Sequence, residues 1–279
     1  MTALATGFAE SPEVNLYYTK RGEGPMLLIL QGGAGSAEGS EALAEALADR
    51  FTVVTYDRRG LSRSKTVHEG CEISTHAADA ARLITTLSPE PVFVIGNSMG
   101  ALIGLELTVR HPDLVRLAVV HEPPVYRLLK GEEQEEALRS HAEVHDAYQR
   151  DGLAAAMKLM IARSGVDIND REPDVHSPAT LQPDSQSVAQ HFGDLQYLLT
   201  WDLPAANRYK PDLAALRAAK AKIIPAIGMN SKGIAASRCT MALAQVLNAA
   251  VIEFPGGHTG YVLRPKAFAE RLAELLKPI

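Results

Sequence analysis

The sequence predicts an α/β protein: a mostly parallel β-sheet with helices on both faces and an inserted helical segment. First, short aliphatic and β-branched runs alternate with longer helical patterns through residues 1–124. Second, clear strand patterns vanish over residues 125–216 and return over 217–279. Third, 279 residues with 46% hydrophobic side chains suffice for one large core plus an insertion. We therefore expect a core domain from residues 1–124 and 217–279 and a helical cap subdomain from 125–216.

The expected strands of the first part are short β-branched or aliphatic runs. They lie at residues 14–19, 26–30, 51–56, 92–95 and 117–120. Between them, helix formers with periodic apolar residues predict helices at residues 41–50, 75–87 and 101–110. Prolines mark two of the ends: Pro89 and Pro91 follow the second helix, and Pro123 and Pro124 prevent the last strand from continuing.

The cap is predicted from helical stretches at residues 132–149 and 153–162, followed by a connector rich in Pro and Asp around 170–184. The alternation of strand and helix then resumes at residues 222–228, 235–247, 251–254 and 265–276. Pro265 suits the first turn of the closing helix, because the N–H groups of that turn have no partner within the helix and the N–H that proline lacks is therefore not missed there.

Charge and composition favour a small-molecule substrate. The net charge of −5, from 28 basic and 33 acidic side chains, provides no large cationic surface for nucleic acid or anionic lipid. The two cysteines, Cys71 and Cys239, are far apart, so neither a disulfide framework nor a zinc ribbon is indicated. We see no secretory leader and no membrane-spanning run, and we expect a cytoplasmic protein without metal or cofactor. The oligomeric state is left open, with a homodimer among the options.

The segment Gly96-Asn97-Ser98-Met99-Gly100 matches the G-x-S-x-G nucleophile elbow, in which a sharp strand-to-helix turn exposes the serine. Composition alone would produce this motif roughly one time in ten, and an ordinary glycine-rich turn is the alternative. The expected strand before it and helix after it supply the required context. We therefore predict Ser98 as a nucleophile.

Two backbone N–H groups are candidates for an oxyanion hole. Met99 follows the nucleophile at a helix N-terminus, where partial positive charge gathers. The glycine-rich loop at residues 31–35 follows strand 26–30, and Gly33 is our choice there.

The base and the acid follow from chain order. Of nine histidines, only His258 lies after the last expected strand, in a glycine-rich loop. Residues 228–233 contain no carboxylate, although in the fold family that the elbow resembles an aspartate is usual after this strand. Glu122 follows strand 117–120 and is our predicted acid, whereas Asp194 and Asp202 in the cap are poorer candidates.

With this elbow, the chain resembles the α/β-hydrolase superfamily over nearly its whole length. Residues 57–64 look like that family's D-x-R-G-x-G-x-S stretch, with Ser62 where a second glycine is usual. The serine elbow, His-Glu-x-Pro after the next strand and Pro-Gly-x-His late in the chain resemble the zearalenone lactonase group. That resemblance implies Ser98, Glu122 and His258 as a triad, with Gly33 and Met99 as oxyanion donors.

We therefore expect a serine hydrolase that cleaves an ester or lactone of a small, largely apolar substrate. A thioesterase or peptidase of the same fold, or a non-catalytic small-molecule binder, is the alternative. Trp201 is our one candidate substrate contact in the cap. His141 and His145 are one helical turn apart, but we expect a solvent-exposed helix face there and no metal.

Overall fold

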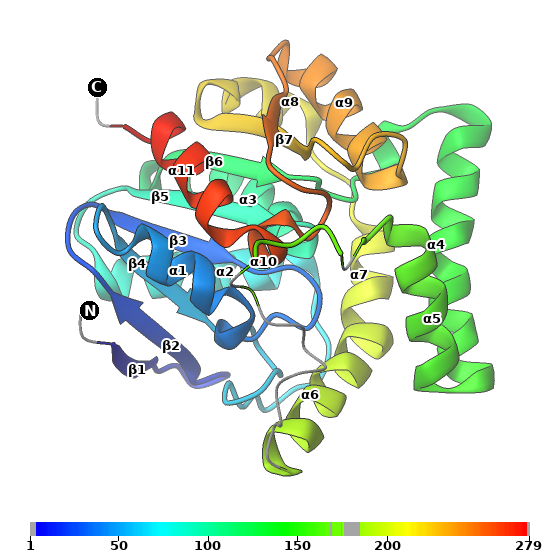
Figure 1. Cartoon of the computed structure of the whole chain (residues 1–279), viewed down its shortest axis with the longest axis horizontal. Coiled ribbons are helices and arrows are strands. Elements are labelled where there is room, and N and C mark those ends of the chain that lie inside the picture. The colour runs from blue at the N-terminus through cyan, green and yellow to red at the C-terminus, as the bar shows by residue number, and fades with distance from the viewer. Residues whose placement is uncertain (1–3, 168, 174, 176–184, 278–279) are drawn as a thin grey trace.

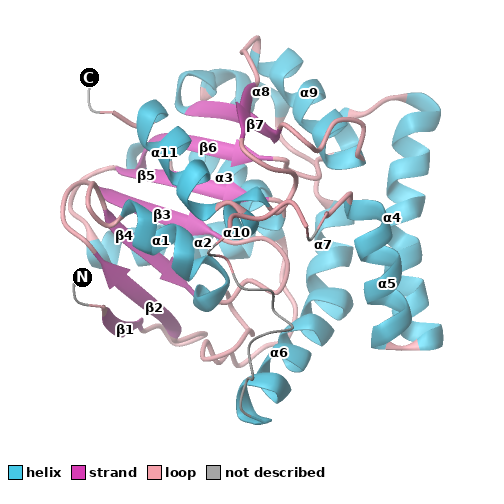
Figure 2. Cartoon of the chain, in the orientation of Figure 1, coloured by secondary structure: helices cyan, strands magenta, loops and turns pink. Residues whose placement is uncertain are grey.

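A computed structural model describes residues 4–167, 169–173, 175 and 185–277. Across these residues an eight-stranded sheet runs in the order β1-β2-β4-β3-β5-β6-β7-β8 (Figures 1 and 2). The strands are β1 (Ala5–Ala9), β2 (Leu16–Arg21), β3 (Met26–Leu30), β4 (Thr52–Tyr56), β5 (Val92–Asn97), β6 (Val115–His121), β7 (Ile223–Gly228) and β8 (Ile252–Phe254). The expected parallel sheet is confirmed from β3 to β8, and β1 and β2 add an antiparallel edge that includes one strand the sequence did not predict.

Helices cover both faces of the sheet, as predicted. They are α1 (Glu41–Leu47), α2 (Ile73–Leu87), α3 (Met99–Arg110), α8 (Leu213–Ala218), α9 (Ala235–Leu247), α10 (Gly260–Leu263) and α11 (Pro265–Leu275). Short 3₁₀ turns lie at Ala37–Ser40, Pro112–Leu114, Tyr126–Leu128 and Lys220–Lys222. No helix within the described part of the chain combines the length and apolar character that crossing a membrane requires.

Alternation along β3 explains the two apolar layers. Leu27 and Ile29 pack in a cluster with side chains of α1 and α11, whereas Leu28 and Leu30 pack in a cluster with α2 and α3. Because successive strand residues point to opposite faces, a fully apolar strand such as β3 supplies both layers at once.

A helical insertion follows β6 and precedes β7. It contains α4 (Gly131–Asp151), α5 (Leu153–Ser164), α6 (Ser185–Tyr197), a π-helical turn η5 (Leu198–Asp202) and α7 (Leu203–Arg208). Figure 1 shows these helices beside the carboxyl ends of the parallel strands. The two helices predicted at 132–149 and 153–162 are α4 and α5.

The insertion has a small core of its own, which includes Val144, Ala156 and Leu199. Tyr209 and Leu216 instead pack in the main core. We therefore propose that the insertion ends before residue 209, earlier than the expected boundary at 216.

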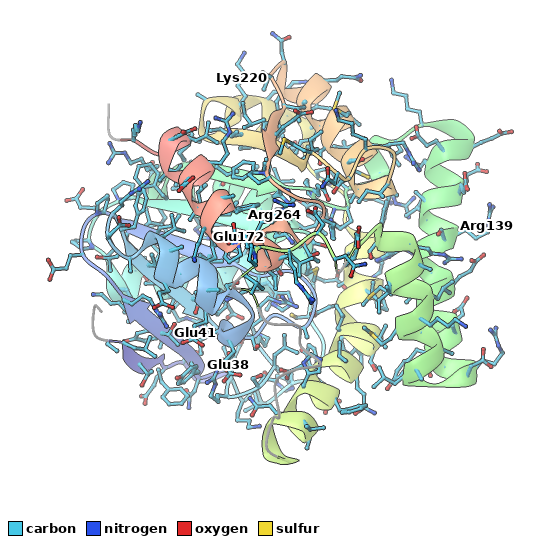
Figure 3. The ribbon with its side chains drawn as sticks, viewed as in Figure 1. Glu38, Glu41, Arg139, Glu172, Lys220 and Arg264 are labelled. Atoms are coloured by element: carbon cyan, nitrogen blue, oxygen red, sulfur yellow. The ribbon has the colours of Figure 1, made fainter. Side chains whose placement is uncertain are left out.

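Part of the predicted connector at 170–184 lies outside the described residues, but its first residues fold back onto the sheet layer. Arg264 Nε donates a hydrogen bond of 2.6 Å to Asp170, and the Glu172 carboxylate accepts one of 2.9 Å from Ala267 N in the first turn of α11 (Figure 3). An anionic side chain is favourable at a helix N-terminus, so Glu172 helps to anchor the connector.

The turn at residues 57–64 is hydrogen-bonded to the insertion. Ser62, which replaces the usual glycine, has a φ of +48°, in the left-handed region. Its N–H donates to Asp194 of α6 at 2.6 Å, and its hydroxyl donates to the other oxygen of the same carboxylate. Two hydrogen bonds to a carboxylate thus accompany a backbone conformation that disfavours serine.

Gly100→Ala should destabilise the protein by about 3 kcal/mol or more, because a Cβ there would overlap the backbone oxygen of Leu30 and force α3 away from β3. Gly104→Ala, one turn later in the same helix, is the matched control. Its Cβ would meet only side-chain atoms at 3.6 Å or more, so helix propensity should leave stability unchanged or raised by up to about 1 kcal/mol. Urea unfolding of both variants measures the difference; equal losses would contradict this account of the elbow.

Candidate active site

Ser98 stands at the junction of β5 and α3. Its φ of +53° and ψ of −117° form a sharp turn that L-residues rarely adopt. The Ser98 N–H donates to the backbone oxygen of His121 at 2.9 Å, which ties the turn to the end of β6. The predicted nucleophile therefore has the strained strand-to-helix geometry that its motif requires.

Glu122 and His258 meet across the carboxyl ends of β6 and β8. Nδ1 of His258 lies 2.5 Å from Oε2 of Glu122, and the Gly228 N–H donates to Oε1 at 2.8 Å. Burial alone would raise the pKa of the Glu122 carboxyl. The hydrogen bond from His258, the neighbouring imidazoles and the Gly228 N–H outweigh burial and hold that pKa below its ordinary value. A carboxylate in this position fixes the imidazole with Nε2 available for proton transfer.

The carboxylates that the sequence ranked lower do not contact His258. Asp194 binds Ser62, as described above, and Asp202 forms an ion pair with Arg58 at 2.6 Å. In the loop after β7, Asn230 donates to Asp170 and Ser231 is buried. Of the acids weighed from the sequence, the structure brings only Glu122 to the histidine.

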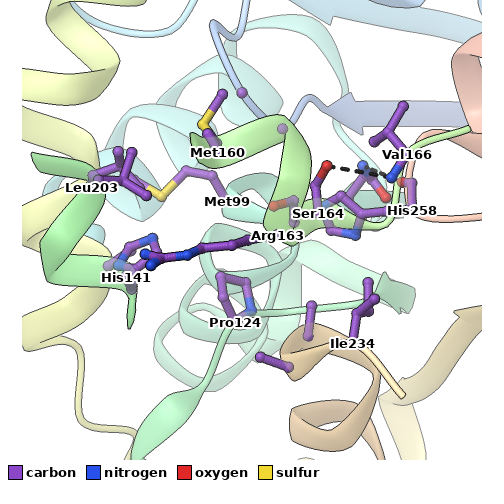
Figure 4. Close-up of a pocket in the computed structure, with 18 of the residues that line it drawn as sticks. Met99, Pro124, His141, Met160, Arg163, Ser164, Val166, Leu203, Ile234 and His258 are labelled. Atoms are coloured by element: carbon purple, nitrogen blue, oxygen red, sulfur yellow. Dashed lines mark hydrogen bonds between the residues drawn. The ribbon is translucent and has the colours of Figure 1, made fainter. Parts of the chain in front are cut away.

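Ser98 and His258 line one cavity of about 410 Å³ between the sheet and the insertion (Figure 4). Within the described residues no hydrogen bond joins their side chains. Such contacts between nucleophile and base are often long until substrate binds, so shared access to one cavity is the relevant observation.

The two residues predicted to supply oxyanion donors also lie at this cavity. Gly33 and Met99 line it, and neither backbone N–H has a hydrogen-bond partner in the described part of the chain. The N–H of Met99 lies at the N-terminus of α3, where a buried helix of 12 residues directs its dipole. The space next to Gly33 is open, since a Cβ there would meet nothing within 4 Å.

The cavity walls are mostly apolar. In Figure 4, Met99, Met160 and Leu203 lie on one side and Val166 and Ile234 on the other. Its polar lining, besides the predicted catalytic and oxyanion residues, includes Asn97, Ser140, His141, Arg163, Ser164, Asp202 and Thr259. The site therefore combines a few convergent polar groups with an apolar surround.

Two expectations about the insertion need correction. Trp201 is not among the residues that line the cavity; it is 37% exposed and its ring packs over Gly70. The π-helical turn directs the next residue, Asp202, inward instead. His141 and His145 are half-buried rather than solvent-exposed: His141 lines the cavity, and His145 Nδ1 bonds to the Leu199 backbone oxygen at 2.7 Å.

A family model for the α/β-hydrolase fold matches residues 25–159. Uncharacterized hydrolase YraK of Bacillus subtilis is 35% identical over 280 residues, which cover 98% of this chain and 97% of the relative. This chain belongs to the α/β-hydrolase family.

Two solved structures resemble this α/β-hydrolase at lower identity. Est816, an N-acyl homoserine lactone degrading enzyme, is 19% identical with a TM-score of 0.68, covering 97% of this chain and 100% of that one. A thermophilic esterase from Thermogutta terrifontis is 18% identical with a TM-score of 0.70, covering 99% and 98%. At these identities the likeness extends to the fold alone.

Hydrogen bonds that the sequence did not reveal connect the residues next to Ser98 and Glu122 with His258 in this α/β-hydrolase. Nδ1 of His121 lies 2.5 Å from Oδ1 of Asn97, and Asn97 Nδ2 donates to the backbone oxygen of His258 at 3.3 Å. The His121 ring also packs against Phe254 and Phe268. The adjacency of Asn97 to the nucleophile and of His121 to Glu122 was the available signal.

Within residues 4–167, 169–173, 175 and 185–277, no three or more His, Cys, Asp or Glu side chains are grouped so as to hold a metal ion. Two of the titratable groups that line the cavity are engaged in ion pairs: His258 with Glu122, and Asp202 with Arg58.

His121 should make stability fall in mild acid. Burial lowers its pKa from 6.5 to about 4, with the Glu122 charge opposing. Between pH 6.5 and about pH 4, His121 is protonated in the unfolded chain but neutral in the folded chain. The free energy of unfolding should therefore fall by up to about 1.4 kcal/mol per pH unit as the pH decreases. His121→Phe, which keeps the aromatic packing, should show a shallower slope in urea unfolding from pH 7 to pH 4. Parallel pH dependences would contradict the assignment.

Proposed function

We propose that this α/β-hydrolase is a serine hydrolase that cleaves a carboxylic ester or lactone of a small, largely apolar substrate through an acyl-enzyme. Ser98 is the proposed nucleophile, His258 the base and Glu122 the acid, with Gly33 and Met99 as oxyanion donors. The observation that carries the proposal is the pairing of the buried Glu122 carboxylate with His258 at the cavity that Ser98 also lines.

In the proposed reaction, Ser98 Oγ attacks the substrate carbonyl while His258 Nε2 takes the hydroxyl proton. The carbonyl electron pair moves to oxygen, and the N–H groups of Gly33 and Met99 stabilise that oxyanion. His258 then gives its proton to the departing alkoxide, which leaves an acyl group on Ser98. A water molecule, deprotonated by His258, hydrolyses this ester and regenerates the serine.

Glu122 serves each of these proton transfers by holding the imidazole and stabilising its charged form. Its depressed pKa means that it stays ionised through the neutral range and below the usual pKa of a glutamic acid.

The substrate class follows from the cavity. A volume of about 410 Å³ with mostly apolar walls suits a small molecule whose polar atoms gather around one carbonyl. The glutamate after β6 resembles the acid of zearalenone lactonases and favours lactones among the esters. Est816 and the Thermogutta esterase show that proteins of this fold act on lactones and esters, which supports the proposal by analogy.

A fluorophosphonate probe should label the folded protein at Ser98, because the activated hydroxyl displaces fluoride from phosphorus. The protein should also hydrolyse p-nitrophenyl esters or simple lactones, and Ser98→Ala should abolish both labelling and turnover. Mass spectrometry of the labelled peptide and product assays measure this. An unlabelled wild-type protein, or a Ser98→Ala variant with undiminished turnover, would overturn the proposal; a pure binder would give ligand stabilisation without product.

Glu122→Gln should lower kcat roughly 10³–10⁴-fold with little change in KM, since an amide can hold the wrong imidazole tautomer and cannot stabilise imidazolium. Ser231→Ala is the matched control, as Ser231 is buried in the loop where the acid is usual and no hydrogen-bond partner holds its hydroxyl in the described residues. It should stay within about threefold of wild type. The reverse ranking in steady-state kinetics would show that the acid is misassigned.

A further inference from the structure

The Arg58 guanidinium lies fully buried under the oxyanion loop at residues 31–35. Nη1 donates to the backbone oxygen of Gln31 at 2.8 Å, and Nη2 donates to that of Gly33 at 2.8 Å. The Arg58 N–H donates to Gly35 at 3.2 Å. Gly35 permits this approach, because a Cβ on it would overlap the guanidinium. One side chain thus donates hydrogen bonds to two backbone carbonyls of a five-residue loop.

These bonds fix the orientation of the proposed oxyanion donor. The Gly33 N–H belongs to the peptide group whose oxygen is that of Gly32, and this oxygen accepts from Gly35 N at 3.1 Å. The peptide groups on either side are those whose oxygens Arg58 holds. Since a peptide group is planar, fixing a carbonyl and both its neighbours fixes the direction of the N–H as well.

The helical insertion supplies the counter-charge. Asp202 at the end of η5 forms an ion pair with Arg58 Nη2 at 2.6 Å, and neither side chain has any exposed area. The second carboxylate oxygen lies 3.3 Å from His76 Nε2. Burial would raise the pKa of the Asp202 carboxyl, but the Arg58 charge and the His76 contact hold it below its ordinary value.

Removal of either partner of the Arg58–Asp202 ion pair should be costly. A buried guanidinium without its carboxylate is strongly unfavourable, whereas the intact pair can be tolerated in a dry interior. Asp202 also lines the substrate cavity, so the residue that neutralises Arg58 belongs to the wall of the site. π-Helical turns are frequent at functional sites, and Asp202 is the buried last residue of this one.

We propose that Arg58 and Asp202 are a positioning pair: Arg58 aims the Gly33 N–H at the oxyanion, and Asp202 of the insertion holds Arg58 in place. The oxyanion hole is then complete only when the insertion is docked on the sheet layer. This inference rests on the proposed serine hydrolase function and adds the two residues that prepare its oxyanion hole.

The adjacent pair Arg59–Asp79 provides a matched control. Arg59 donates to both oxygens of Asp79 at 2.8 Å, and these side chains are also nearly inaccessible. In the described structure Arg59 makes no bond to residues 31–35. Asp79→Asn therefore removes a buried counter-charge beside the same turn without touching the oxyanion loop.

The experiment compares Asp202→Asn, Arg58→Lys and Asp79→Asn in steady-state hydrolysis of a p-nitrophenyl ester, well below each melting temperature. Asp202→Asn and Arg58→Lys should lose kcat about 10–100-fold with KM nearly unchanged, since a misdirected donor costs less than the 10²–10³-fold of a deleted one. Lysine cannot reach two carbonyls as the guanidinium fork does. Asp79→Asn should keep kcat within about threefold, whatever its loss of stability.

A second readout separates positioning from structural damage. A trifluoromethyl ketone that forms a hemiketal with Ser98 places an oxyanion in the hole, whereas the corresponding secondary alcohol does not. The affinity of Asp202→Asn for the ketone should fall by about the same factor as its kcat/KM. Its affinity for the alcohol should equal that of the wild type. The pH profile should keep its wild-type shape, because Glu122 and His258 are untouched.

The outcomes are distinguishable. Wild-type protein that neither hydrolyses esters nor reacts with the ketone would refute the proposed function itself. An active wild type together with full kcat and full ketone affinity in Asp202→Asn would refute the positioning pair alone. Equal kinetic losses in Asp202→Asn and Asp79→Asn would also refute it, since the effect would then belong to any buried counter-charge. If Asp202→Asn does not fold, Arg58→Lys decides by the same criteria.

Discussion

The buried carboxylate of Glu122 is the constraint on which the site depends. A charge without solvent is costly unless each oxygen is bonded, and here the partners come from different strands. Gly228 at the end of β7 donates to one oxygen, and His258 after β8 donates to the other. The Glu122 N–H donates to Ala226 on β7 at 2.9 Å. Satisfying one charge therefore sets the relative positions of three strand ends.

The nucleophile is coupled to the same point. Residue His121, immediately before Glu122, accepts the Ser98 N–H on its backbone oxygen and contacts Asn97 through its side chain. Asn97 in turn donates to the backbone of His258. The proposed nucleophile, base and acid thus belong to one hydrogen-bonded assembly at the carboxyl ends of β5, β6 and β8, where parallel sheets commonly place their sites.

The insertion is held by its carboxylates rather than by apolar contact alone. Asp194 of α6 accepts two hydrogen bonds from Ser62, and Asp202 of η5 neutralises Arg58. Both partners lie in the turn that follows β4, and Arg58 also donates to two backbone oxygens of the loop at residues 31–35. Arg58 therefore connects a residue of the cavity wall with the loop of the proposed oxyanion hole.

The sequence by itself determined the sheet from β3 to β8, the helices α1, α2, α3, α9 and α11 on its faces and the strand–turn–helix context of Ser98. These are local properties: apolar period, glycine at crowded backbone and proline at ends are written within a few residues of where they act. It also singled out Glu122 and His258 by chain order and by the vacant acid position, and the structure brings these two together.

Only the tertiary structure decided which side of η5 faces the site and what Asp202 pairs with. Arg58 and Asp202 are 144 positions apart in sequence, and neither lies in a pattern that predicts the other. Trp201 and Asp202 are neighbours, yet one packs over Gly70 and the other lines the cavity. Sequence periodicity cannot separate them, because the direction of a side chain in a π-helical turn is set by how the whole insertion packs on the sheet layer.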